Sequence, residues 1–117
     1  MSSNFSKYIS ILQIEIEDLR SDLNLLISRL EDDQKSARIS QYTYLENKTL
    51  YLNELKGLEL IQTHTGTVDL GGFTNLEELC TSLKKMLYQD LHDHGIAMAV
   101  YNHLEKKLDK IYKYISQ

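Results

Sequence analysis

Apolar residues recur along residues 9–30 with a spacing that alternates between three and four positions. The members of this seam are Ile9, Leu12, Ile16, Leu19, Leu23, Leu26 and Leu30. A heptad pattern of this kind is typical of helices that pack against one another along their length. Further apolar residues, among them Ile14 and Leu25, lie off this line. The pattern predicts a helix over residues 4–34 whose apolar face is wider than one partner helix can cover.

Three more amphipathic helices follow from the same kind of periodicity. The second is predicted over residues 37–62, with apolar positions that spread around the helix. The third is predicted over residues 75–93 and the fourth over residues 96–115, each with a clearer apolar face. Residues 31–36 contain no apolar side chain, so they form either a turn or a solvated part of a continuing helix. The absence of proline agrees with long uninterrupted helices.

Two interruptions separate the later helices. Residues 64–72 hold three of the five glycines, which indicates a long connection across the end of a bundle. The segment Thr74-Asn75-Leu76-Glu77 matches a capping box, with Phe73 in the staple position, and marks the start of the third helix. His94-Gly95 is a C-terminal stop, because glycine adopts the left-handed cap conformation freely.

These elements predict an all-α protein, an antiparallel four-helix bundle with a long loop between the second and third helices. At 117 residues, the whole chain is expected to form a single domain, residues 1–117. The alternative joins the first two helices into one long rod, giving a long helical hairpin that completes its core in a dimer. The breadth of the first apolar face keeps both arrangements open.

Composition and charge exclude several classes of function. Thirteen basic and seventeen acidic side chains give a net charge of −4, which argues against broad nucleic-acid binding because such binding needs a dense array of Lys and Arg. No apolar run approaches the roughly 18 residues of a membrane span. Cys80 is the single cysteine, so it has no partner for an internal disulfide, and it falls beside the apolar face of the third helix. We expect a cytoplasmic protein with a buried, inert thiol.

The densest polar cluster of the chain ends the third predicted helix, over residues 90–95. Within it, Leu91-His92-Asp93 resembles the phosphoacceptor box in the dimerisation helices of one subclass of sensor histidine kinases. The resemblance covers about six residues. It implies that His92 accepts a phosphoryl group and that Asp93 acts as the general base. This chain departs from the family because Gly95 follows the box one residue early and interrupts the helix after it. The remaining residues are used by the bundle and leave no room for an ATP-binding domain, so the resemblance implies a phosphotransfer module or a degenerate relative and not a kinase.

A metal site and a metal-dependent enzyme are weaker interpretations of the acidic and histidine residues. Asp90 and His94 are four residues apart and share a helix face, but two ligands do not make a site, and a third would have to come from His64 or His103. The spacing of Glu15 and Asp18 is similar to that used for magnesium by all-helical nucleotide pyrophosphohydrolases, but the second helix offers no matching acidic pair. We expect no catalytic residue, no metal and no cofactor.

Lysines and tyrosines supply the remaining candidate surface. Lys106, Lys107, Lys110 and Lys113 cluster near the end of the fourth helix, where cations stabilise the negative helix end or form a docking patch for an acidic partner. The chain also has eight tyrosines, and pairs such as Tyr42 and Tyr44 cannot share one buried face. Some tyrosines must therefore be exposed, as is common at protein interfaces.

Together these patterns predict a small non-enzymatic helical module for protein–protein interaction, a regulatory or signalling adaptor. We expect it to form a homodimer through the seam of the first helix, because an excess apolar stripe usually marks an interface. Neither nucleic acid nor a membrane is an expected partner. The alternative function is histidine phosphotransfer, or a degenerate kinase-dimerisation-like module, that uses His92.

Overall fold

The computed structural model describes residues 2–117 and shows an all-helical chain. Its elements are α1 (Ser2–Lys35), α2 (Gln41–Thr65), the short 3-10 helix η1 (Leu70–Gly72), α3 (Leu76–Asp93) and α4 (Met98–Ser116). No strand occurs in the residues described. The prediction of an all-α fold with four helices and a long connection between the second and third is confirmed.

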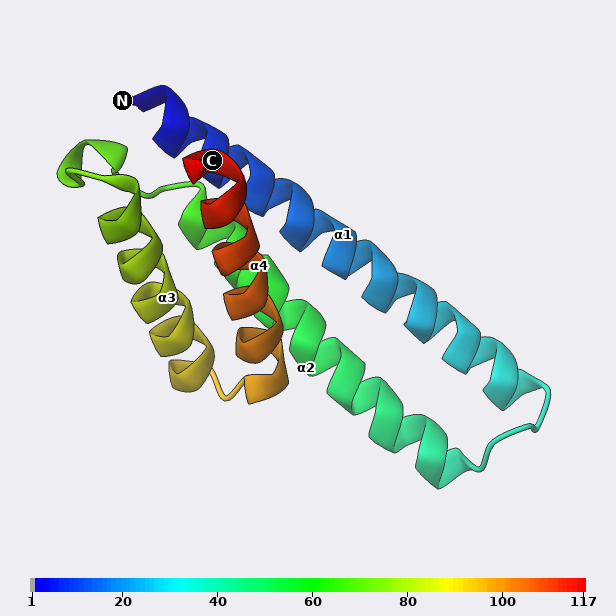
Figure 1. The fold of residues 1–117 in the computed structure, drawn as a ribbon. Helices are drawn as coiled ribbons and strands as arrows, with labels where there is room; N and C mark the ends of the chain where they lie inside the picture. Colours follow the sequence, from blue (N-terminus) through cyan, green and yellow to red (C-terminus); the bar gives the residue numbers. More distant parts are fainter. Residues whose placement is uncertain (1) are drawn as a thin grey trace.

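The four helices form two antiparallel hairpins of unequal length (Figure 1). A helix rises about 1.5 Å per residue, so the 34-residue α1 is about 51 Å long, whereas the 18 residues of α3 span about 27 Å. The α3–α4 hairpin therefore packs over only one half of the α1–α2 hairpin, and the other half extends beyond it. The molecule is elongated, with extents of 55 × 27 × 20 Å. We call the part of α1 and α2 beyond α3 and α4 the free end of the hairpin.

The chain reverses direction between α1 and α2 over residues 36–40. Ala37 adopts a positive φ of 57°, and the side chain of Ser40 caps α2 by accepting a hydrogen bond of 3.1 Å from the backbone N–H of Thr43. The alternative in which the first two helices form one rod is therefore wrong. Residues 31–35 continue α1, and α2 begins at Gln41, four residues later than predicted.

The start of α3 also differs from its prediction by one residue. The N-cap is Asn75, whose side chain accepts a hydrogen bond of 2.8 Å from the backbone N–H of Glu78. The predicted box began at Thr74, which instead hydrogen-bonds the Glu78 carboxylate through its hydroxyl (2.9 Å). Asparagine is at least as good a cap as threonine, so the chain uses the later residue. The predicted stop at Gly95 is confirmed, with φ at 65°.

The turn between α3 and α4 is attached to α2. Asn53 accepts a hydrogen bond of 3.0 Å from the backbone N–H of Ala97 and donates one of 3.2 Å to the carbonyl of Gly95. One helical turn later, a Cβ added at Gly57 would lie 2.6 Å from a methyl group of Ile96. The glycine inside α2 thus allows the close approach of this turn, which fixes where α4 begins on the hairpin.

The hydrophobic core lies where all four helices meet. It includes Leu12, Ile16, Leu58, Ile61, Leu79, Leu83, Leu87, Leu91, Leu104 and Leu108, each at most 2% exposed. Tyr8 is also fully buried there, and its hydroxyl donates to the backbone carbonyl of Leu108 (2.8 Å) and lies 3.3 Å from the Sγ of Cys80. Cys80 is a free and buried thiol, as expected.

Candidate interaction surfaces

The heptad seam of α1 has a buried part and an open part. Leu12 and Ile16 are completely buried inside the bundle, and Leu23 and Leu30 are buried as well. Ile9 and Leu19 are partly exposed, and Leu26 is 38% exposed. The prediction that the whole seam forms an interface between chains is thus corrected for its buried members, because their side chains already pack within their own chain. Leu26 is the one residue of the seam in the exposed class.

Apolar side chains remain in solvent at the free end of the hairpin. Leu25 is 52% exposed and Tyr42 is 74% exposed, and the other exposed members are Leu26, Leu45, Leu50 and Leu52. Tyr44 is buried close by, where its hydroxyl donates to the Glu31 carboxylate at 2.7 Å. The expectation that Tyr42 and Tyr44 point to different sides is confirmed. Because α3 and α4 leave these side chains exposed in the described structure, the leucines are available to another molecule.

One stripe of α1 combines exposed leucines with two charges. Asp22, Leu25, Leu26 and Arg29 follow one another at intervals of three, one and three residues, so they share one helix face. All four are exposed. Within residues 2–117, neither Asp22 nor Arg29 belongs to an ion pair. We call these four residues the α1 stripe.

A cleft of about 280 Å³ opens beside this stripe, where α1, α2 and the first turns of α4 meet. Its apolar wall includes Leu19, Leu26 and Leu58, and its acidic residues are Asp22 and Glu54. Burial raises the pKa of the Glu54 carboxyl. In the described part of the chain no lysine or arginine pairs with either carboxylate. We call this hollow the acidic cleft.

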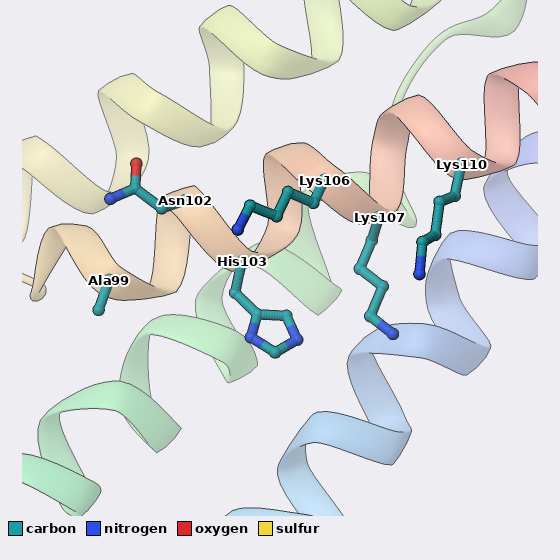
Figure 2. Close-up of a pocket in the computed structure, with 6 residues that line it drawn as sticks. All are labelled: Ala99, Asn102, His103, Lys106, Lys107 and Lys110. Atoms are coloured by element: carbon teal, nitrogen blue, oxygen red, sulfur yellow. The ribbon is translucent and has the colours of Figure 1, made fainter.

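The predicted lysine patch lines a second hollow, of about 410 Å³, along the exposed side of α4. Its basic residues are His103, Lys106, Lys107 and Lys110, which Figure 2 shows together on one helix. Lys107 extends toward α1 and forms an ion pair of 2.9 Å with Glu15. Lys113 does not line this hollow. The structure therefore groups three of the four predicted lysines, adds His103, and leaves Lys106 and Lys110 without an ion pair among the residues described. We call it the basic groove.

His92 lies in the last turn of α3 with its side chain 66% exposed. Its Nδ1 is 3.7 Å from a carboxylate oxygen of Asp93, and its ring stacks on that of Tyr88 at a centroid distance of 6.0 Å. The imidazole is accessible to a reagent, but α3 ends one residue later at Asp93. The phosphoacceptor of the family that the segment resembles lies instead in the middle of a helix.

The histidines near Asp90 do not assemble a metal site. His64 from α2 contacts the Asp90 carboxylate through Nδ1, while His94 contacts the backbone carbonyl of Asp90 at 2.9 Å. No group of three or more potential ligands is found among the described residues. Glu15, from the Glu15 and Asp18 pair considered for magnesium, is likewise engaged in an ion pair of 2.9 Å with Lys107. The two histidines, Asp90 and Glu15 thus each have a hydrogen-bond or ion-pair partner within their own chain.

The acidic cleft is the feature that the sequence did not reveal. Leu19 and Asp22 come from α1, Glu54 from α2 and His103 from α4, so three helices contribute to it. No spacing within any one helix signals such a site. The α1 stripe was not predicted either, and the signal that could have indicated it is the placement of the opposite charges of Asp22 and Arg29 on either side of Leu25 and Leu26.

Comparisons with known proteins add no family to this picture. No protein-family model, no curated protein and no solved structure matches the chain. Among the described residues, none of the helices combines the length and apolar character that a membrane crossing requires. The function has to be inferred from the surfaces of the molecule.

Proposed function

We propose that the protein is a non-enzymatic interaction module that self-associates as a homodimer through α1. We further propose that it serves as a regulatory or signalling adaptor in the cytoplasm, where its single buried thiol requires no disulfide partner. A dimer presents each surface of the chain twice, which suits a protein that brings other proteins together.

The observation that carries this proposal is the half-covered hairpin. The α3–α4 pair covers one half of α1 and α2 (Figure 1). On the uncovered side Leu25, Leu26 and Leu50 are exposed to water. Burying apolar surface yields about 25 cal/mol per Å², so covering this end is favourable. Exposed Tyr42 adds an aromatic side chain of the kind enriched in interfaces.

Absolute mass by light scattering over a concentration series tests the proposal. We expect the mass to rise from the monomer value of 13.6 kDa to twice that value as the concentration increases. The double variant Leu25→Asp/Leu26→Asp should remain monomeric. Ile14→Asp is the matched control, since Ile14 is an exposed apolar residue on the covered half of α1 and should leave the dimer intact. A wild-type chain that stays monomeric at high micromolar concentration would contradict self-association.

A second candidate function is phosphotransfer at His92, supported by the exposed imidazole and its neighbouring carboxylate of Asp93. A neutral imidazole polarised by a carboxylate is a suitable nucleophile for a phosphoryl group. Incubation with a small acyl phosphate should then give an acid-labile phosphate on the wild-type protein and none on His92→Ala. Equal labelling of the two proteins would reject His92 as the acceptor.

A further inference from the structure

We infer that two copies of this chain join through an antiparallel contact between their α1 helices, in which Arg29 of each copy enters the acidic cleft of the other. This inference rests on the proposed self-association and adds its geometry. The observations that carry it are the order of residues in the α1 stripe, the two carboxylates of the cleft that lack a cation, and the position of the basic groove.

The α1 stripe is symmetric about its own centre. Asp22 and Arg29 lie equally far from the midpoint between Leu25 and Leu26. A two-fold axis through that midpoint makes two α1 helices antiparallel, and each Asp22 then faces Arg29 of the other copy, with the leucines at the centre. This is an isologous interface, in which the same patch of both copies is used.

A parallel arrangement of the same helices lacks this complementarity. It would set Asp22 against Asp22 and Arg29 against Arg29, and like charges facing each other are unfavourable in an interface. The charges of the stripe therefore select the antiparallel orientation, while Leu25 and Leu26 contribute the apolar area.

The acidic cleft offers Arg29 of the second copy a ready binding place. In this register Arg29 is level with Asp22, which lines the cleft together with Glu54. A guanidinium carries five N–H donors in a planar fork and can bind two carboxylates at once. The aliphatic part of the arginine side chain would lie along Leu19 and Leu26 in the cleft wall.

The outer end of the same contact places an acidic segment of one copy near the basic groove of the other. The register places Asp32 and Asp33 of one copy level with Leu19 and Asp18 of the other. Leu19 shares a cleft with His103, and so the acidic end of α1 approaches the basic groove of α4. Asp33 then faces Asp18, a like-charge contact that is reduced by the ion pair of Asp33 with Arg38 (3.3 Å) and by Lys106 and Lys110 of the groove.

Charge reversal tests the pairing of Asp22 with Arg29. Arg29→Asp should raise the dissociation constant of the dimer by about 30-fold or more, because it places a third carboxylate at the acidic cleft. Asp22→Arg alone should also weaken the dimer, by placing two arginines face to face. The double variant Asp22→Arg/Arg29→Asp restores opposite charges and should recover most of the affinity. Sedimentation equilibrium measures all four proteins, and additive losses in the double variant would overturn the inference.

Cross-linking of introduced cysteines tests the orientation independently. In the antiparallel register, the two copies of residue 25 are offset by about 1.5 Å along the helix axes, whereas the two copies of residue 14 are about 35 Å apart. A short bis-maleimide should therefore link Leu25→Cys into covalent dimers but not Ile14→Cys. The wild-type chain is the reagent control, because its only cysteine is buried.

The outcomes separate the inference from the proposal on which it rests. A wild-type dimer with cross-linking at residue 14, or with none at residue 25, overturns the antiparallel register and leaves self-association standing. A wild-type monomer at high micromolar concentration overturns both. A dimer that cross-links only at residue 25 and regains affinity in the charge-swapped variant supports the inference.

Discussion

Leu104→Ala is expected to lower the free energy of unfolding by about 2–5 kcal/mol. The Leu104 side chain is completely buried in α4, at the centre of the region where the four helices meet. Its truncation removes apolar contacts and leaves a cavity that the surrounding helices fill only in part. Because small proteins have a total stability of about 5–15 kcal/mol, a loss of this size leaves a marginally folded chain.

Urea denaturation measured at a concentration well below dimer formation provides the comparison, since association would add to the apparent stability. Leu50→Ala is the control at the free end of the hairpin. Leu50 is 45% exposed, so its truncation should change the free energy of unfolding by less than about 0.5 kcal/mol. Equal losses in the two variants would mean that α4 does not pack on the hairpin as the structure describes.

Alkaline pH is expected to destabilise the protein through Tyr8. Burial of this phenol, together with its contact to Cys80, raises its pKa far above the usual value. Unfolding exposes the ring, and its pKa then returns to about 10. The contribution of Tyr8 is therefore fully present well below pH 10 and declines as the pH rises through 10, so that about 1.4 kcal/mol in total is lost by pH 11.

The variant Tyr8→Phe isolates this effect. At pH 8 it should be less stable than the wild type by about 1 kcal/mol, the usual contribution of a hydrogen bond such as the one to the Leu108 carbonyl. At pH 11 the difference should vanish or reverse, because the phenylalanine has no proton to lose. Tyr42→Phe, whose ring is exposed, should follow the wild-type pH profile. A constant gap between Tyr8→Phe and the wild type from pH 8 to pH 11 would contradict the argument.

Periodicity predicted the existence and type of the four helices, because an apolar residue every three to four positions is imposed by the helix itself. It could not predict the end of α1. No glycine or proline marks the turn at residues 36–40. The residue that adopts a positive φ there is Ala37, and alanine is not a residue type that signals this conformation. The polar segment before it is equally compatible with helix and turn, so both a rod and a hairpin remained possible.

Periodicity also could not predict which residues of the heptad seam are buried. Leu12 and Leu26 occupy equivalent heptad positions, yet one is completely buried and the other is 38% exposed. Their difference depends on where α4 begins, which is set by the contacts of Asn53 and Gly57 with the turn before it. A helical pattern identifies an apolar face but not the element that covers it. The acidic cleft depends on the same long-range placement.

The unequal length of the two hairpins also determines how the molecule moves through a solvent or a gel matrix. A compact chain of this size has a radius of gyration of about 13 Å, whereas this one has 16.5 Å. A rod-like monomer diffuses more slowly than a sphere of equal mass, so a column calibrated with compact standards would assign it too high a mass. An apparent mass taken from elution volume alone would therefore overestimate the mass of the monomer and bias the result toward a dimer.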